Sequence, residues 1–206
     1  MTNLDTTVER FADLAAEIAR RPARLGPVRW VAVDGPSGAG KTTFAERLAG
    51  ALESAGWRAV VVHTDELLDG WDDQFTFWPR LESGVLEPLS RGEPGSHPVY
   101  DWVAGRFAGS RPVPVPDVLI VEGATSARAD GYPRWTLSVF LTAEPELRLR
   151  RVLARDGPEI ETPLRRWMAA EDDYFAAAGT ADRVDRLVDG VAWVGHDPGD
   201  GYVRLR

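Results

Sequence analysis

Short apolar runs alternate with helical patterns along most of the chain. Five of these runs, rich in valine, leucine and isoleucine, predict buried strands over Val28–Val33, Arg58–Thr64, Val118–Val121, Leu137–Thr142 and Arg186–Val188. Helical patterns separate them, an alternation that is typical of parallel strands joined by crossover helices on both faces of a sheet. We therefore expect an α/β fold in which ligands bind beyond the carboxyl ends of the strands.

Helical periodicity marks the segments between and around these strands. Apolar residues recur at helical spacing over Asp5–Arg20, which predicts an N-terminal amphipathic helix. This helix and the linker after it account for residues 1–27. Further helices are predicted to begin at Thr42, to lie near Phe77–Leu89, to end at Arg155 and to span Pro163–Ala178.

Two segments depart from the simple alternation. Residues 66–117 form an insert that is too long for a plain connection, and we expect it to cover the substrate, with an irregular decoration as the alternative. At the C-terminus, Val191–Val194 and Tyr202–Leu205 flank Asp-Pro-Gly-Asp-Gly and predict a hairpin within residues 191–206. The 206 residues are expected to form a single domain.

Composition and charge narrow the classes of protein. Apolar residues make up 44% of the chain and charged residues 27%, a balance that predicts a folded protein rather than a disordered one. Neither a membrane-spanning run nor the apolar core of a signal peptide is evident, so we expect a cytoplasmic protein without membrane contact. The net charge of −8 argues against nucleic-acid binding, and the lack of cysteine excludes thiol and cysteine–zinc chemistry.

The strongest motif begins directly after the first predicted strand. Residues 35–42 read Gly-Pro-Ser-Gly-Ala-Gly-Lys-Thr and match G-x-x-x-x-G-K-[ST] between a strand and a helix. The glycines let backbone N–H groups turn toward a phosphate at the N-terminus of the helix. A glycine-rich turn that caps a helix without a ligand is the alternative. We expect the nucleotide to be bound by Gly35, Ser37, Gly38, Ala39, Gly40, Lys41, Thr42 and Thr43.

Two residues of this motif carry specific chemistry. Lys41 is the one lysine among 24 basic residues, and its compact, movable charge suits the β- and γ-phosphates of a triphosphate. Thr42 is expected to place its hydroxyl on Mg²⁺. Because the N-K-x-D motif of guanine-specific switches needs another lysine, that class is disfavoured. Since nothing predicts the further modules of a mechanical ATPase, a kinase is favoured, and assembly into a homo-oligomer is left open.

Acidic residues at the ends of two predicted strands supply the remaining chemistry of phosphoryl transfer. Asp65 follows the second strand, where a carboxylate can accept the proton of an acceptor hydroxyl; a helix N-cap is the alternative. Glu122 ends the third strand, where an acidic residue holds Mg²⁺ directly or through water. Its alternative is a strand-end residue that binds loop amides.

Three arginines recur on one face of the helix after the fourth strand. Arg151 and Arg155 are candidates for a lid over residues 151–167 that closes on the phosphates. For Arg148 we expect a solvated helix face, paired with Glu144 and Glu146.

In order and spacing, these segments resemble the uridine kinase and phosphoribulokinase-related group of P-loop kinases. The resemblance runs from about Val28 to Gly190. It rests on the phosphate loop, on Asp65, and on the segments Pro98–Trp102, Val118–Gly123 and Arg148–Asp156. It implies a P-loop NTPase αβα sandwich with the strands ordered 2-3-1-4-5, a lid, and the use of ATP and Mg²⁺. In that family the first acidic residue after the second strand is the base, which falls on Asp65.

The acceptor is the least determined part of this interpretation. The resemblance places nucleoside contacts on Tyr100 and Asp101, but the family's following histidine is missing and only Arg106 is kept. Trp78 and Trp102, in or beside the insert, have aromatic faces suited to stacking a ring, although ordinary packing is the alternative. We expect a small-molecule acceptor with a hydroxyl group, such as a uridine- or cytidine-like nucleoside. A regulatory nucleotide-binding protein and a cytidylate-kinase-like enzyme are the rivals.

Overall fold

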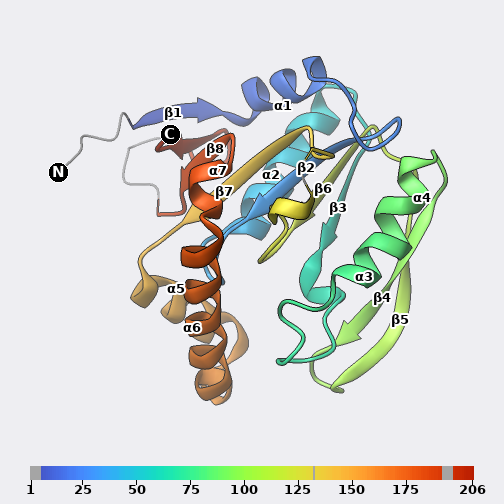
Figure 1. The fold of residues 1–206 in the computed structure, drawn as a ribbon. Helices are drawn as coiled ribbons and strands as arrows, with labels where there is room; N and C mark the ends of the chain where they lie inside the picture. Colours follow the sequence, from blue (N-terminus) through green and yellow to red (C-terminus); the bar gives the residue numbers. More distant parts are fainter. Residues whose placement is uncertain (1–5, 132, 192–196) are drawn as a thin grey trace.

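A seven-stranded sheet forms the centre of the computed structural model, which describes residues 6–131, 133–191 and 197–206 (Figure 1). The strands lie in the order β1-β9-β8-β7-β2-β6-β3. Five of them run parallel: β2 (Arg29–Asp34), β3 (Ala59–His63), β6 (Val118–Glu122), β7 (Leu137–Thr142) and β8 (Arg186–Asp189). Their order across the sheet is β3-β6-β2-β7-β8, which is the order 2-3-1-4-5 expected from the sequence.

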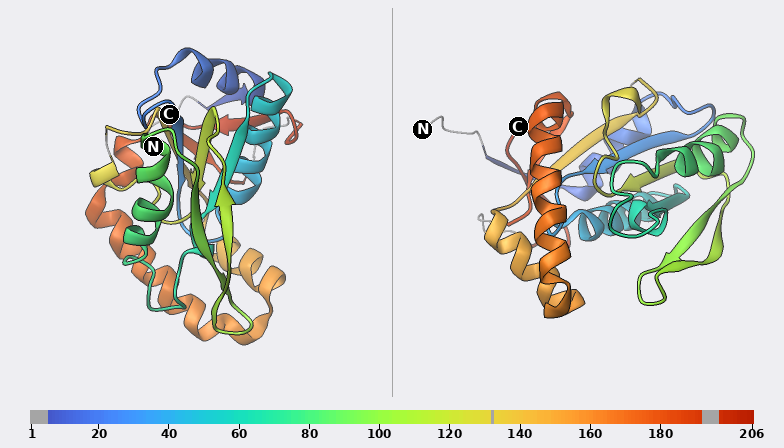
Figure 2. Two further views of the ribbon diagram at one scale, coloured as in Figure 1. Left: turned by 90° about the vertical axis from the view of Figure 1, so that its right-hand side faces the viewer. Right: turned by 60° about the horizontal axis from the view of Figure 1, so that its bottom comes forward.

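Alternating side chains of the parallel strands build two cores, one on each face of the sheet. Val31 and Val33 of β2 point into a core with α1 (Phe11–Arg20) and α2 (Lys41–Ser54). Trp30 of the same strand points into the opposite core, which it shares with the helices of the insert and with Trp167 of α6 (Glu161–Ala178). Figure 2 shows the helices on the two sides of the sheet. The period-two alternation of a strand therefore produces the three-layer αβα sandwich.

The N-terminal segment differs from its prediction. Thr7–Arg10 form β1, an edge strand that pairs antiparallel with β9 (Gly201–Arg204), and the helix begins at Phe11 instead of Asp5. Val8, an apolar residue within the segment predicted as helix, is 39% exposed. The edge of β9 presents unpaired backbone groups, and pairing with β1 satisfies them. Local helical periodicity could not reveal this partner, which lies at the other end of the chain.

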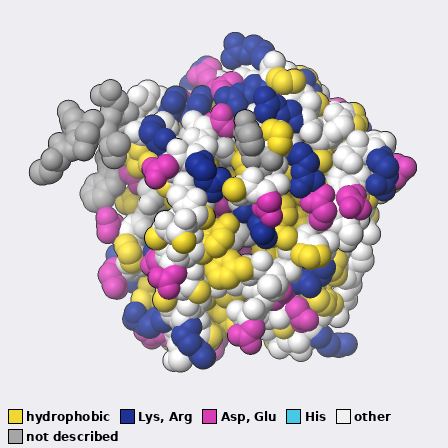
Figure 3. Space-filling view, viewed as in Figure 1, with side chains coloured by type: hydrophobic (Ala, Val, Ile, Leu, Met, Phe, Trp, Pro, Cys, Tyr) yellow, Lys and Arg dark blue, Asp and Glu magenta, His cyan; other side chains and the backbone are white. Residues whose placement is uncertain are grey.

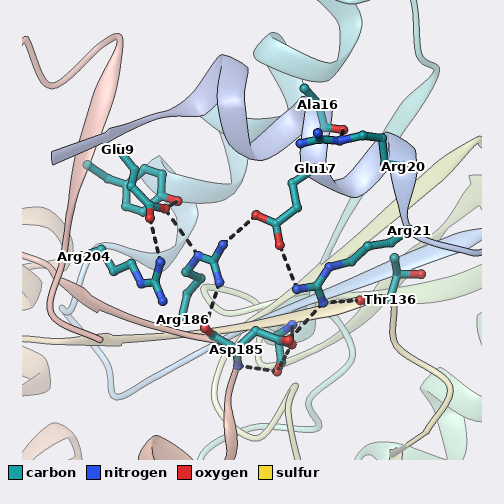
Figure 4. Close-up of polar contacts among 11 residues, drawn as sticks. Glu9, Ala16, Glu17, Arg20, Arg21, Thr136, Asp185, Arg186 and Arg204 are labelled. Carbon is teal, nitrogen blue, oxygen red and sulfur yellow. Dashed lines mark hydrogen bonds and ion pairs between the residues drawn. The ribbon is translucent and has the colours of Figure 1, made fainter. Parts of the chain in front are cut away.

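Charged side chains fasten this N-terminal segment to the C-terminal strands (Figure 4). Glu9 accepts hydrogen bonds from Tyr202, Arg186 and Arg204, and Arg186 also donates to Glu17 at 2.6 Å. Helix α1 also packs on α2 through the rings of Phe11 and Phe44. The N-terminal segment is therefore held by charged contacts and by aromatic packing. The first and last strands of the chain, β1 and β9, thus lie side by side at one edge of the sheet.

The insert is more regular than expected. Trp78–Leu81 (α3), a π-helical turn at Glu82–Leu86 and Glu87–Ser90 (α4) follow one another without a break, which agrees with the helix predicted near Phe77–Leu89. The Gly/Pro-rich stretch after them forms a two-stranded antiparallel ribbon of β4 (Gly95–Asp101) and β5 (Arg106–Val113). This ribbon forms a sheet of its own and lies apart from the central sheet in space, although β4 and β5 come between β3 and β6 in the sequence (Figure 2).

The remaining helices follow β7. The arginine-rich helix is α5 (Pro145–Asp156), and α6 is followed by the short α7 (Thr180–Arg183). Single 3₁₀ turns occur at Thr64–Glu66, Ala129–Gly131 and Pro158–Ile160. The first strand of the expected C-terminal hairpin falls on residues 192–194, which lie outside the described residues, whereas β9 pairs with β8 and β1.

Acidic and basic side chains are interspersed over the face seen in Figure 1, as the space-filling view in Figure 3 shows. Among the described residues, no helix combines the length and the apolar character that crossing a membrane requires.

Candidate active site

The carboxyl ends of three parallel strands meet at one edge of the sheet and define the site. The phosphate loop follows β2, Asp65 follows β3, and Glu122 is the last residue of β6. Because β2, β6 and β3 are neighbours, the parallel arrangement brings these three positions together although they are far apart in sequence. The strands predicted around each motif therefore bring the three candidate positions to one edge of the sheet.

The phosphate loop adopts the backbone that its glycines permit. Gly38 and Gly40 have φ values of +76° and +98°, and α2 begins at Lys41, directly after Gly40. A side chain at Gly38 would place its Cβ 2.5 Å from the carbonyl oxygen of Arg148. Nζ of Lys41 donates to the carbonyl oxygen of Pro36 at 3.1 Å, so the lysine side chain folds back along the loop. The loop and the N-terminus of α2 together form an anion-binding geometry.

Asp34, the last residue of β2, ties the phosphate loop to the segment after β6. Its fully buried carboxylate accepts backbone hydrogen bonds from Gly35 at 2.7 Å, Thr125 at 2.8 Å and Ala127 at 2.9 Å. Burial raises the pKa of Asp34 to about 6, against the effect of these donors. Thr125 has a φ of +71°, a conformation that a threonine adopts only when its surroundings impose it. The sequence analysis missed this structural role, although a carboxylate at the end of a buried strand was a usable signal.

The proposed metal ligands lie side by side. Oγ1 of Thr42 donates to Oε1 of Glu122 at 3.1 Å, and Nδ1 of His63 lies 2.6 Å from the same oxygen. The hydrogen bond with Glu122 raises the pKa of His63. A hydroxyl and a carboxylate are the hard oxygen donors that Mg²⁺ prefers, so the residues fit this ion. Sequence reasoning did not identify His63, whose contact with Glu122 depends on the pairing of β3 with β6.

Asp65 lines a pocket together with Lys41, Thr42 and Glu122, and it is exposed to solvent. Desolvation of its carboxyl group by the surrounding protein raises the pKa of Asp65, and the negative charge of Glu122 raises this pKa further. The positive charges of Lys41 and Arg155 oppose the shift. The 3₁₀ turn after β3 begins at Thr64 with His63 at its N-cap position, so Asp65 does not cap this turn. A free carboxyl group that faces the phosphate loop suits a proton acceptor.

The three arginines of α5 occupy different environments. The guanidinium of Arg151 donates to the carbonyl oxygens of Gly38 at 3.2 Å and Gly190 at 3.0 Å, so it lies against the phosphate loop. Arg155 is bound to Asp156 at 2.7 Å and lines the pocket that contains Lys41.

Arg148 contradicts its prediction of a solvated side chain paired with Glu144 and Glu146. It is 3% exposed, and its charged partners are Asp172 at 3.0 Å and Glu171 at 4.0 Å. Helix α6 covers this face of α5, which helical periodicity alone could not show.

A buried carboxylate from α6 also contacts the phosphate loop. Glu171 is fully buried and accepts hydrogen bonds from the backbone N–H of Ser37 at 2.9 Å and from its hydroxyl at 2.7 Å. Nε1 of Trp167 donates to Glu171 at 3.0 Å and lies 3.1 Å from the Ser37 hydroxyl. Burial raises the pKa of Glu171. The sequence analysis named neither Trp167 nor Glu171, because a lone acidic residue on an amphipathic helix carries no signal of its own.

Many of these groups line one pocket of about 180 Å³, whereas Asp34, His63 and Arg148 lie outside its lining. Its walls include most of the residues expected to bind the nucleotide, both metal-ligand candidates, the candidate base and both lid arginines: Ser37, Gly38, Gly40, Lys41, Thr42, Thr43, Asp65, Glu122, Arg151 and Arg155. A second cavity of about 370 Å³ adjoins it and shares Gly40, Thr43 and Arg151. The two cavities provide a continuous surface on either side of Arg151.

Tyr100 and Trp102, both expected to contact the acceptor, are not among the residues that line the pocket. Nε1 of Trp102 donates to the backbone carbonyl oxygen of Asp65 at 3.2 Å, and its ring contacts Tyr100 and Trp71. Trp71 in turn contacts Trp167, which closes a chain of aromatic rings from the insert to α6.

The other predicted acceptor contacts lie elsewhere. Asp101 accepts the backbone N–H groups of Val103 and Ala104 at the turn of the ribbon, and Arg106 is its exposed partner on β5. Trp78 is buried in the core beside Trp30, with Nε1 donating to Thr125 at 3.3 Å. The structure therefore places Trp78 among core residues rather than among those that line the pocket.

Comparison with solved structures identifies the fold. The chain superimposes on a possible uridine kinase from Bacillus stearothermophilus with a TM-score of 0.64 and 20% identity, covering 86% of this chain and 96% of that one. A candidate fructose transport system kinase from Silicibacter sp. TM1040 gives a TM-score of 0.57 and 23% identity, covering 82% and 94% of the two chains. The fold is that of P-loop kinases of the uridine kinase type. This confirms the αβα fold that the alternation of strands and helices and the resemblance to P-loop kinases predicted.

Comparisons of sequence extend over part of the chain. No family model matches it. It is 32% identical over 132 residues to the inorganic pyrophosphatase TTM2 of Arabidopsis thaliana, which covers 61% of this chain and 19% of that protein. The inorganic pyrophosphatase TTM1 of the same plant is 28% identical over 136 residues, which is 61% of this chain and 20% of that protein. The chain thus spans about a fifth of the length of the curated relatives that it matches.

Proposed function

We propose that this P-loop protein is an ATP- and Mg²⁺-dependent kinase that transfers the γ-phosphate to a hydroxyl group of a nucleoside or a similar small metabolite. The observation that carries the proposal is the content of one pocket. It is lined by Lys41 with the amides of the phosphate loop, by the Thr42–Glu122 pair, and by Asp65. These are the groups that phosphoryl transfer to an alcohol requires.

The donor is assigned to both cavities. The phosphates lie along the loop near Lys41, where backbone N–H groups and the lysine ammonium bind them. The base and ribose extend past Arg151 into the adjoining cavity, which has apolar walls from Phe44, Leu141 and Tyr202. The side chain of Arg151 separates the two regions and reaches the loop at Gly38.

Thr42 and Glu122 are the residues assigned to Mg²⁺, as their oxygens lie 3.1 Å apart. When bound, the ion neutralises phosphate charge and orients the phosphate oxygens. His63 contacts the same oxygen of Glu122 as Thr42 does and helps to fix the orientation of the carboxylate.

Asp65 is assigned as the base. The acceptor oxygen forms a bond to the γ-phosphorus, the bond from that phosphorus to the β,γ-bridging oxygen breaks, and the acceptor proton passes to the Asp65 carboxylate. Lys41, Arg151 and Arg155 supply positive charge to the transferred group. The raised pKa of Asp65 makes it a stronger proton acceptor than an ordinary aspartate.

The acceptor is assigned to the region between Asp65 and the insert. Trp102 and Tyr100 lie there, with Trp102 bound to the backbone of Asp65. A nucleoside acceptor is supported by the resemblance to uridine kinases and by the name of the solved structure with a TM-score of 0.64. Asp101 and Arg106, at the base of the ribbon turn, are assigned to the acceptor on the strength of the resemblance.

A screen with γ-labelled ATP tests the proposal. Nucleosides, sugars and other hydroxylated metabolites are incubated singly with enzyme, ATP and Mg²⁺, and labelled products are separated from free phosphate. We expect one class of acceptor to yield a labelled phosphate ester, and Lys41→Met to abolish the product. Release of inorganic phosphate with no ester from any acceptor would contradict the proposal and favour phosphoanhydride hydrolysis, the activity in the names of the two curated relatives.

A further inference from the structure

An internal carboxylate occupies part of the phosphate loop. Glu171 of α6 accepts both the backbone N–H and the hydroxyl of Ser37, the third residue of the loop. It lines the same pocket as Lys41. Loop amides are the groups that bind phosphate oxygens, so a carboxylate that takes one of them stands where an anionic ligand would compete.

The position of this carboxylate is electrostatically unfavourable for a triphosphate. Glu171 is fully buried, and a negative charge there repels phosphate oxygens with little screening by water. A nucleotide that approaches the loop must either accept this repulsion or displace Glu171 from Ser37.

A second partner for Glu171 already lies beside it. Nη1 of Arg148 is 4.0 Å from Oε2 of Glu171, beyond hydrogen-bonding distance. Arg148 is 3% exposed, and its Nε and Nη1 atoms are buried without a hydrogen-bond partner, while Nη2 is bound to Asp172 at 3.0 Å. Buried guanidinium donors without partners are costly, so a small movement of Glu171 toward Arg148 would satisfy both groups.

We propose that Glu171 is a positioning residue that occupies the phosphate loop in the absence of nucleotide and moves to Arg148 when a triphosphate binds. Glu171 lies on α6 and Arg148 on α5, the two helices that contribute to the proposed lid over residues 151–167. The movement of Glu171 from Ser37 to Arg148 therefore couples nucleotide binding at the phosphate loop to the positions of α5 and α6. Wild-type affinity for nucleotide is lowered by this competition. The inference rests on the proposed binding of a nucleoside triphosphate.

Calorimetry with the β,γ-imido analogue of ATP and Mg²⁺ tests the competition. In Glu171→Gln the side chain can still accept from Ser37 but carries no charge, so we expect binding about tenfold tighter than in the wild type. Asp173→Asn is the matched control, since it removes a negative charge from an exposed position of the same helix close to Glu171. We expect its affinity to stay within about twofold of wild type. Equal affinities of wild type and Glu171→Gln would overturn the inference but leave the proposed function intact, whereas lack of binding by both would overturn the two together.

Arg148→Lys tests whether the Glu171 carboxylate moves to Arg148 when the nucleotide binds. Lysine keeps the charge but lacks the planar fork, so it offers fewer donors to Glu171. We expect affinity for the analogue to fall several-fold in the wild-type background and to be unchanged in the Glu171→Gln background. An equal loss in both backgrounds would show that Arg148 acts independently of Glu171 and would overturn the exchange.

The indole N–H of Trp167 reports on its contact with the Glu171 carboxylate. It donates to Glu171, so its resonance in ¹⁵N-tryptophan-labelled protein reports on the carboxylate; the chain has eight tryptophans, and Trp167→Phe assigns the signal. We expect the signal to shift when the analogue binds and to be shifted already in nucleotide-free Glu171→Gln. A Trp167 resonance that stays unchanged at saturating analogue would overturn the movement.

Discussion

Nδ1 of His63 lies 2.6 Å from Oε1 of Glu122, the oxygen to which Thr42 also donates. This contact connects the last residues of two neighbouring strands, β3 and β6, which are paired at this position. One oxygen of the Glu122 carboxylate is therefore held by His63 and by Thr42 of the helix that follows the phosphate loop. The orientation of the carboxylate is a property of the strand pairing, and the proposed metal site depends on it.

Replacing Glu122 by Gln tests the assignment of the metal. The amide keeps the shape of the side chain but loses the negative charge that attracts Mg²⁺, so we expect the Mg²⁺ concentration for half-maximal turnover to rise by about tenfold or more. A magnesium titration of initial rates measures the change. Glu46→Gln, on the exposed side of α2, is the control and should behave as wild type. An unchanged titration of Glu122→Gln would remove Glu122 from the metal site.

Asp65→Asn tests the proton acceptor. We expect turnover to fall by about a hundredfold or more while the affinity for ATP is retained, because the amide cannot take the proton. Asp69→Asn, an exposed neighbour, should leave both quantities close to those of the wild type.

The pH dependence gives a further expectation for Asp65. Because its pKa is raised, its carboxylate becomes protonated at a higher pH than an ordinary aspartate would. Wild-type kcat/KM should therefore fall with decreasing pH through this raised pKa, beginning above the usual range of an aspartate. Initial rates across a pH series measure this fall in kcat/KM. A kcat/KM that stays constant down to the ordinary pKa of aspartate would contradict the assignment of Asp65 as the base.

Lys41→Met should abolish productive binding of the triphosphate. The lysine lines the pocket between the loop and Glu122, and removing its charge leaves the β- and γ-phosphates without their movable cation. Calorimetry with ATP and Mg²⁺ measures the loss, which we expect to exceed about a hundredfold in affinity. Arg150→Met, which removes an exposed cation of α5, is the control for overall charge. Normal turnover by Lys41→Met would refute the role of the loop.

Asp34→Asn should destabilise the fold by about 2–3 kcal/mol. Two of its three backbone donors bind Oδ1 and the third, from Ala127, binds Oδ2, so an asparagine must direct an NH₂ group at a backbone N–H. The free energy of unfolding from urea titration measures the effect. Asp13→Asn, on the surface of α1, should change that free energy by less than about 0.5 kcal/mol. Equal stabilities of the two variants would show that the Asp34 bonds do not support the fold.

Two glycine substitutions should change the stability of the fold in opposite directions. Gly38→Ala places a Cβ 2.5 Å from the backbone of Arg148 at a φ of +76°, so we expect it to lower stability by about 2 kcal/mol or more and to weaken nucleotide binding. Gly50, on an exposed position of α2, has no atom within 4 Å of the added Cβ, so Gly50→Ala should raise stability by about 0.5–1 kcal/mol. Thermal and urea unfolding measure both. A stable Gly38→Ala with normal affinity would contradict the close packing of the loop on α5.

Signals that are local in sequence were sufficient for the sheet and for most of the pocket. The apolar runs located the five parallel strands, and the spacing of Gly35–Thr42 located the phosphate loop. Because parallel strands bring their carboxyl ends to one edge, Asp65 and Glu122 could be placed beside Lys41 without coordinates. Their chemical roles in turnover stay predictions.

Contacts between segments that are distant in sequence were decided by the tertiary structure alone. Thr7–Arg10 became a strand because β9 presented an open edge, and Arg148 became buried because α6 covers α5. Glu171 reaches Ser37 across 134 positions of the chain. Periodicity reports which face of a helix is apolar but carries no information about which element will pack on it. The sequence by itself thus determined the elements and the nucleotide-binding loop, whereas packing decided which charges surround that loop.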